Sequence, residues 1–164
     1  MQLKKVLQLS GVLTWINLII SAILVFFALA SGLLMVGLAA TITPIVMWGS
    51  VIVHSYAVLQ LRKSLIHGAP LQQQTAIGIR FIGWVAIFIA VIWAATGMMA
   101  IQNAKEVAQQ LTQQVQLPAE YKNIDMSNFA RGIGAFFLFL SFCVITNVII
   151  NIRLLRLYHQ NHQE

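Results

Sequence analysis

Long stretches without a charged residue dominate the chain and predict its elements. No Asp, Glu, Lys or Arg occurs over 56 positions from Val6 to Leu61, over 24 from Phe81 to Ala104, or over 21 from Gly132 to Ile152. A helix needs about 20 apolar residues to cross the hydrocarbon core of a bilayer. The first stretch is long enough for two crossings and each of the others for one, which predicts four membrane-spanning helices.

The expected fold is an all-α, integral membrane four-helix bundle that forms a single domain over residues 1–164. The first two spans form a hairpin, because the connection between them is short and uncharged. Pro44 suits the first turn of the second helix, where its missing N–H is not needed, and Thr43 is a suitable cap. The predicted spans cover residues 11–36, 42–61, 77–102 and 129–155.

The segment over residues 103–128 is the only sizeable piece outside these spans. Apolar residues recur in it at positions 104, 107, 108, 111 and 115, which is the spacing of one helical face. We expect the third helix to continue through this segment for several turns beyond the membrane and to stop before Pro118. Ser127 or Asn128 then caps the fourth helix, which continues past the membrane toward His162.

The first span has a basic start, and Ala28-Leu29-Ala30 resembles the cleavage site of a signal peptide. Its apolar stretch is longer than the core of a usual signal peptide, so we expect a retained helix.

Composition supports a membrane protein and disfavours other classes. Hydrophobic residues make up 59% of the chain and charged residues 9%, against roughly 25% charged in soluble domains. The formal charge of +6 comes from cations next to apolar runs, so we expect no nucleic-acid partner. Cys143 is the single cysteine, which excludes a disulfide within the chain.

Lys and Arg are distributed unequally between the two sides of the predicted membrane domain, and cytoplasmic sides carry the excess. Three lie on one side, partly offset by three acids, and seven on the side of the chain ends, so we expect both termini in the cytoplasm. The seven are Lys4, Lys5, Arg62, Lys63, Arg80, Arg153 and Arg156.

Polar side chains inside the spans gather near this side. Asn17, His54 and Asn147 each lie about six to eight residues into their span, or roughly 9–12 Å deep at about 1.5 Å per residue. With Ser55 and Asn151 they form a candidate site, which we call the polar layer. Three interpretations are open: hydrogen bonds between helices, a polar chamber that binds a ligand or lines a pathway, or side chains that face different ways.

His54 is the only ionisable side chain well inside a span. It is either a core histidine whose hydrogen bonds are satisfied within the protein, or a ligand or proton relay. No second His, Cys or carboxylate accompanies it in the spans at a spacing that suits a metal or haem, so we predict no metal and no cofactor. No Asp or Glu lies in any span, whereas cation-coupled transporters usually need one. No catalytic motif is present, which favours a protein that is not an enzyme.

Two further features concern packing and lipid. Ala86, Ala90, Ala94 and Gly97 form a stripe of small residues on the third span, which predicts either helix–helix packing or an oligomer interface. Arg62, Lys63 and Arg80 flank the loop between the second and third spans and are expected to attract lipid head groups.

This loop also carries a resemblance. It reads Leu65-Ile66-His67-Gly68-Ala69-Pro70-Leu71 and is followed by Arg80-Phe81-Ile82-Gly83-Trp84. About twenty residues here, with the helix count, resemble a bacterial family of uncharacterised four-helix inner-membrane proteins that have Gly-x-Pro-Phe in this loop. The chain departs from that family at Leu71, where the family has an aromatic residue, and in its tail. The resemblance implies a bacterial inner membrane and no particular activity.

Three hypotheses of function follow. The first is a non-enzymatic membrane protein that acts through assembly, as a homo-oligomer or as an accessory subunit of a membrane complex. The second is a channel or small-solute transporter with a polar chamber on the cytoplasmic side. The third is a cofactor-binding membrane protein that uses His54.

Overall fold

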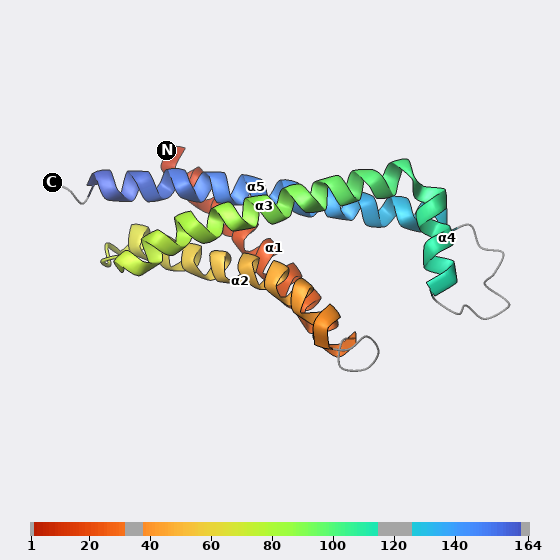
Figure 1. Cartoon of the computed structure of the whole chain (residues 1–164). Helices are drawn as coiled ribbons and strands as arrows, with labels where there is room; N and C mark the ends of the chain where they lie inside the picture. The colour runs from red at the N-terminus through yellow and green to blue at the C-terminus, as the bar shows by residue number, and fades with distance from the viewer. Residues whose placement is uncertain (1, 32–37, 115–125, 162–164) are drawn as a thin grey trace. The chain divides into compact units, whose positions relative to one another are not determined.

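The computed structural model describes residues 2–31, 38–114 and 126–161, which form five helices and, within these ranges, no strand (Figure 1). The helices are α1 (Gln2–Ser31), α2 (Leu38–His67), α3 (Gln73–Gln102), α4 (Ala104–Gln114) and α5 (Ser127–Asn161). All except α4 are long and apolar enough to cross a membrane. The predicted all-α fold with four membrane-length helices is confirmed.

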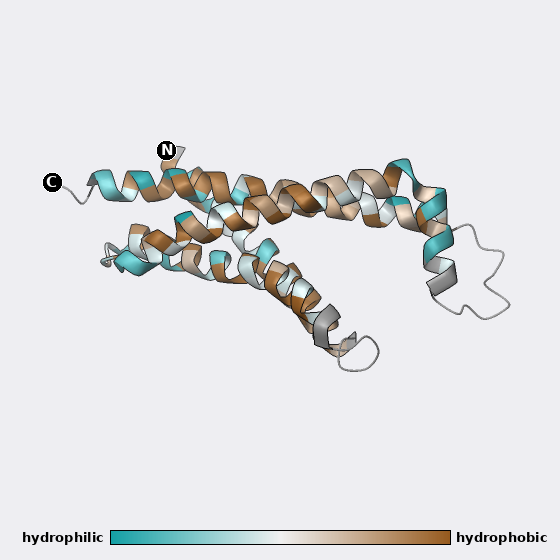
Figure 2. Cartoon of the chain, in the orientation of Figure 1, coloured by the Kyte–Doolittle hydropathy of each residue, from teal (hydrophilic) through white to brown (hydrophobic). Residues whose placement is uncertain are grey.

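Apolar side chains cover the outside of these helices as well as their contacts. Figure 2 shows hydrophobic residues along the four long helices and hydrophilic ones in α4 and toward the end of α5. Phe26 and Phe88 are each 68% exposed, and many other large apolar side chains are also exposed. Water would not tolerate so much apolar surface, but lipid would. These helices indicate an integral membrane protein.

Contacts group the chain into two compact units. Unit 1 comprises Met1–Ile89 and Cys143–Glu164, and unit 2 comprises Ala90–Phe142. Helices α3 and α5 therefore contribute to both units. The single domain over residues 1–164 stays a prediction.

Unit 1 has an apolar core near the loop that joins α2 to α3. Leu61, Ile79 and Leu154 are fully buried in it, and Tyr158 packs beside them. The hydroxyl of Tyr158 accepts a hydrogen bond from the backbone N–H of Leu71, at 2.8 Å. This core holds the end of α2, the start of α3 and the end of α5 together.

The sharp exit from α2 depends on Gly68. Its φ of +66° lies in the left-handed region that favours glycine, directly after the last helical residue, His67. A glycine in this position is a common helix C-cap. It lets the chain turn and begin α3 at Gln73.

In unit 2, the segments of α3 and α5 approach so closely that their backbones touch. A Cβ placed on Gly97 would lie 2.6 Å from the carbonyl oxygen of Gly134, and a Cβ placed on Gly134 would lie 2.6 Å from that of Gly97. Nearby, the hydroxyl of Ser141 donates a hydrogen bond to the carbonyl oxygen of Ala90. Small residues permit this approach, which is a usual way to pack helices in lipid.

The prediction for Pro44 and Thr43 is wrong. Helix α2 begins at Leu38, so Pro44 lies inside the helix rather than in its first turn, and Thr43 is not its cap. Leu38, Ala39 and Ala40 are good helix formers and extend the helix on the N-terminal side of the proline. The predicted end of the first span at Val36 lies outside the described residues.

The prediction of a continuous third helix is also wrong. Helix α3 ends at Gln102, and the chain turns at Asn103 into the separate helix α4, which Figure 1 shows bent away from α3. Asn is a poor helix former, and the turn lets α4 bury Ala104 and Ala108 instead of leaving them in water. The predicted stop before Pro118 lies outside the described residues. The predicted continuation of the fourth helix past its span is confirmed, because α5 runs to Asn161.

The contact between Gly97 and Gly134 yields a prediction. We expect Gly134→Ala to lower the free energy of unfolding by about 1–3 kcal/mol, because the new methyl group would meet backbone atoms that cannot move cheaply. Gly132→Ala is the matched control in the same helix, since a Cβ there meets nothing within 4 Å. Thermal unfolding in detergent micelles measures both, and equal midpoints for the two variants would contradict the close approach.

Candidate functional site: a polar layer in unit 1

Helix α1 turns its polar face toward the protein. Every described α1 residue that is buried is polar or glycine, while large apolar side chains of the same helix, such as Trp15 and Phe26, are exposed. The spacing of the buried residues places them on one helical face. This arrangement suits a helix surrounded by lipid, because polar side chains within a membrane face the protein interior. The buried residues are Ser10, Gly11, Thr14, Asn17 and Ser21.

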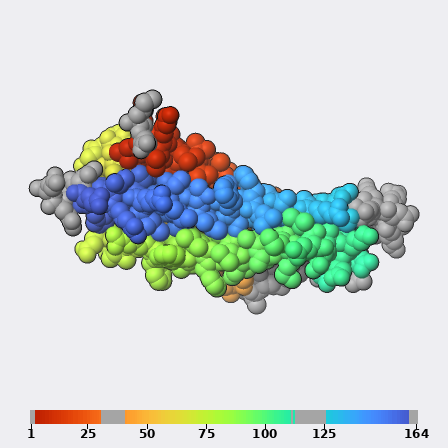
Figure 3. Space-filling model, turned by 90° about the horizontal axis from the view of Figure 1, so that it is seen from above, coloured from red at the N-terminus to blue at the C-terminus, as the bar shows by residue number. Residues whose placement is uncertain are grey.

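Two of these side chains join α1 to α5 through hydrogen bonds. Figure 3 shows the start of α1, in red, against the later part of α5, in blue. The Ser10 hydroxyl donates to Asn151 Oδ1 at 2.6 Å. The Thr14 hydroxyl donates to the Ser10 carbonyl oxygen at 2.7 Å and lies 3.1 Å from Asn147 Oδ1. We call these four side chains, Ser10, Thr14, Asn147 and Asn151, the α1–α5 seam.

Asn151 also ties the seam together along α5. Its amide nitrogen donates to the Asn147 carbonyl oxygen at 2.6 Å and lies 2.8 Å from Asn147 Oδ1. Asn151 therefore takes part in three contacts of hydrogen-bonding length. For Asn151, the structure therefore agrees with the first of the three interpretations, hydrogen bonding between helices.

Five other polar atoms of the layer are buried without a hydrogen-bond partner among the described residues. His54 is 1% exposed, and neither of its ring nitrogens has a hydrogen-bond partner among the described residues. The same holds for Asn17 Oδ1, Ser55 Oγ and Asn147 Nδ2. Burying a polar atom without a partner costs about 1–3 kcal/mol. Each of these five atoms is therefore available to accept or donate a hydrogen bond to water or a solute.

Gly83 of α3 makes room for the His54 ring. A Cβ on Gly83 would lie 3.2 Å from His54 Cε1 and 3.0 Å from a methyl carbon of Val148. The ring thus lies between α2 and α3, next to the residue that follows Asn147 on α5. Helices α2, α3 and α5 together surround the imidazole.

The layer members lie at similar depths. Arg62 of α2 lies against Gly11 of α1, and the two helices are antiparallel. His54 precedes Arg62 by eight residues, so it is level with about residue 19 of α1. Thr14 marks the level of Asn147. At about 1.5 Å per residue, the levels of Asn147, Asn17 and His54 fall within roughly 8 Å along α1. Hydrogen bonds in the described structure join Asn147 and Asn151 to α1, but none joins His54 to Asn17.

The stripe of small residues on α3 faces other parts of the same chain. Ala86 and Ala90 are fully buried, Ala94 is half-buried, and Gly97 packs on Gly134. The carbonyl of Ala90 accepts the hydrogen bond from Ser141. These positions serve helix–helix packing within the protomer.

The three predicted lipid-facing cations differ from one another. Lys63 and Arg80 are exposed, whereas Arg62 is half-buried and its guanidinium lies against Gly11.

The sequence reasoning left Ser10, Thr14 and Gly83 out of the site. A signal for the first two was present, because Ser10, Thr14, Asn17 and Ser21 recur at intervals of four, three and four along an otherwise apolar helix. The sequence marks Gly83 only as part of the motif that follows the loop, because its role beside His54 depends on which helix faces that ring.

The chemistry available in the polar layer is neutral hydrogen bonding. A neutral imidazole offers one donor and one acceptor, Ser55 a hydroxyl, Asn17 an acceptor and Asn147 a donor. No group of three or more His, Cys, Asp or Glu side chains that could hold a metal ion occurs in the described part of the chain.

Comparisons with models of protein families, with curated proteins and with solved structures found no match to this chain. The resemblance noted for the loop between α2 and α3 stays a prediction.

The contrast between Asn151 and His54 yields a prediction. We expect Asn151→Leu to lower the free energy of unfolding by about 1–2 kcal/mol, because three contacts worth roughly 0.6 kcal/mol each are lost. His54→Leu should leave it unchanged or raise it, because the variant removes two unpaired buried nitrogens. Unfolding of both variants in detergent micelles tests this. Equal losses of stability would mean that His54 is bonded in the folded protein.

Proposed function

We propose that the chain is a channel or small-solute transporter that binds a neutral, hydrogen-bonding solute at the polar layer. The observation that supports this most is the group of five unpartnered polar atoms buried among α1, α2 and α5. A purely structural layer would be expected to pair its own donors and acceptors, as Ser10, Thr14 and Asn151 do in the α1–α5 seam. The donor set is uncharged, which favours a neutral solute over an ion.

The proposed membrane is the bacterial inner membrane, with both termini in the cytoplasm. In support, the seven cations of the described part of unit 1 belong to helix ends that hydrogen bonds and the apolar core hold together. Such an excess of Lys and Arg is typical of a cytoplasmic side. On this orientation the polar layer is reached from the cytoplasm.

Flux through liposomes tests the transport proposal. We expect vesicles that contain the protein to take up water, glycerol or urea faster than protein-free vesicles in stopped-flow light scattering. His54→Leu and Asn17→Leu should reduce the added permeability at least tenfold, because they remove the hydrogen-bonding atoms that replace the solute's hydration.

The matched control is Ser50→Ala in the same helix as His54. The Ser50 hydroxyl is satisfied by the carbonyl oxygen of Met47, at 2.8 Å, so this variant should conduct like the wild type. No added permeability for any of the three probes would contradict the proposal. Permeability that survives both layer substitutions would mean that the pathway lies elsewhere.

Assembly is a second candidate function, and one observation favours it. Phe81, Trp84 and Phe88 form an exposed row on α3, at 69%, 65% and 68% exposure. Their spacing of three and four residues lies along one helical face, as in helices that pack against a partner. A second copy or another membrane subunit fits this row.

Native mass spectrometry in detergent tests assembly. We expect an oligomer, or a co-purifying subunit, that is lost in the double variant Trp84→Ala and Phe88→Ala, because the packing surface is removed. Phe26→Ala, which truncates an equally exposed aromatic on α1, is the control and should keep the complex. A strictly monomeric wild type with no partner would count against assembly.

A further inference from the structure

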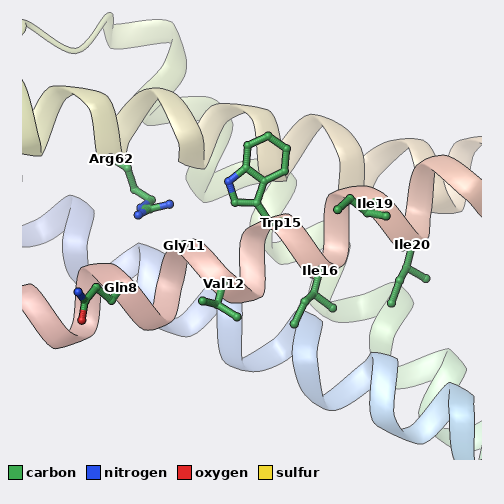
Figure 4. A pocket seen from close by; sticks show the side chains of 8 residues that line it. All are labelled: Gln8, Gly11, Val12, Trp15, Ile16, Ile19, Ile20 and Arg62. Carbon is green, nitrogen blue, oxygen red and sulfur yellow. The ribbon is translucent and has the colours of Figure 1, made fainter.

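A groove of about 870 Å³ runs along α1 in unit 1 and ends at Arg62 of α2 (Figure 4). Its apolar part is lined by Val12, Trp15, Ile16, Ile19 and Ile20, and Gln8 lies at the end nearer the N-terminus. The groove is therefore polar at one end and apolar along the remainder. This is the pattern of an amphiphile with a polar head and a hydrocarbon chain.

The cation at the polar end packs against a glycine. Arg62 reaches from α2 to α1, where its guanidinium lies directly against Gly11. A Cβ at position 11 would overlap the guanidinium in its present position, so a larger residue there would require the Arg62 side chain to move. The same contact keeps the charge next to α1 and at the mouth of the groove.

Arg62 has no carboxylate partner among the described residues of unit 1. Its Nε is buried without a hydrogen-bond partner among the described residues. The described part of unit 1 contains no Asp or Glu at all. The half-buried guanidinium therefore has no carboxylate partner within the described residues of unit 1, and a bound anion would supply the counter-charge.

The length of the groove matches one leaflet. Gln8 and Ile20 are twelve residues apart, or about 18 Å along the helix at 1.5 Å per residue. The hydrocarbon core of a bilayer is about 30 Å thick, so a leaflet contributes roughly half of that. Arg62 directly follows the uncharged stretch that ends at Leu61, which places it at the boundary of the hydrocarbon.

We propose that this groove binds one molecule of an anionic glycerophospholipid. The phosphate accepts hydrogen bonds from the guanidinium of Arg62, with Gln8 beside it, and one acyl chain lies along Val12, Trp15 and Ile16. A guanidinium suits a phosphate because its planar fork can bond two oxygens at once. The site is separate from the polar layer and does not depend on the transport proposal.

Lipid titration of the full chain, stripped of lipid in dodecyl maltoside and followed by native mass spectrometry, tests the site. The probes are dioleoyl phosphatidylglycerol, dioleoyl phosphatidylcholine and glycerol phosphate. We expect one phosphatidylglycerol to bind about tenfold more tightly than phosphatidylcholine, which corresponds to about 1.4 kcal/mol. Glycerol phosphate, which lacks acyl chains, should not bind over the same range.

Two neighbouring cations provide the matched pair of variants. Arg62→Gln should abolish the preference for phosphatidylglycerol. Lys63→Gln should change it by less than about twofold, because Lys63 is exposed and does not line the groove.

Equal binding of the two lipids by the wild type would overturn the proposal, as would equal losses in the two variants. Binding of glycerol phosphate as strong as that of the lipid would show a plain anion site and overturn the role of the groove. Even if Arg62→Gln does not fold, the comparison of the three probes on the wild type still tests whether the groove prefers an anionic lipid.

Discussion

Hydrocarbon offers no hydrogen bonds, and this constraint orders the structure. A polar side chain within a membrane-spanning helix must find its partner in the protein, in water or in a bound molecule. The α1–α5 seam meets this demand internally through Ser10, Thr14, Asn147 and Asn151. The seam connects the first and last helices of the chain, which are otherwise covered outside by apolar side chains. The polar atoms that remain unpaired, on Asn17, His54, Ser55 and Asn147, are then the informative ones.

The sequence predicts the membrane-length helices well, because their cause is local. The spacing of charged residues alone separates α1 with α2 from α3 and from α5. It fails at two helix boundaries, one set by neighbouring helix formers and one by burial. The start of α2 before Pro44 goes against the rule that places proline in the first turn, and the turn at Asn103 follows from the burial of Ala104 and Ala108.

The pairing of the side chains in the candidate site was not predictable from their depth in the sequence. Counting residues from the membrane boundary brings Asn17, His54 and Asn147 to a similar level. Depth does not say which face of each helix points inward. It therefore did not identify Thr14 as the hydrogen-bonding neighbour of Asn147. Helical spacing along α1 carries that information, whereas the place of Gly83 beside His54 requires the packed helices.

The two faces of helix α1 have different roles. Its polar face holds the seam and Asn17, and its apolar face lines the groove that ends at Arg62. Gly11 lies between these faces and is small enough for the guanidinium to rest on it. His54 and Arg62 are eight residues apart on α2, or about 12 Å along the helix. A lipid phosphate on Arg62 would therefore sit about two helical turns from His54. At that distance the lipid would neutralise the charge of Arg62 and leave the polar layer unoccupied.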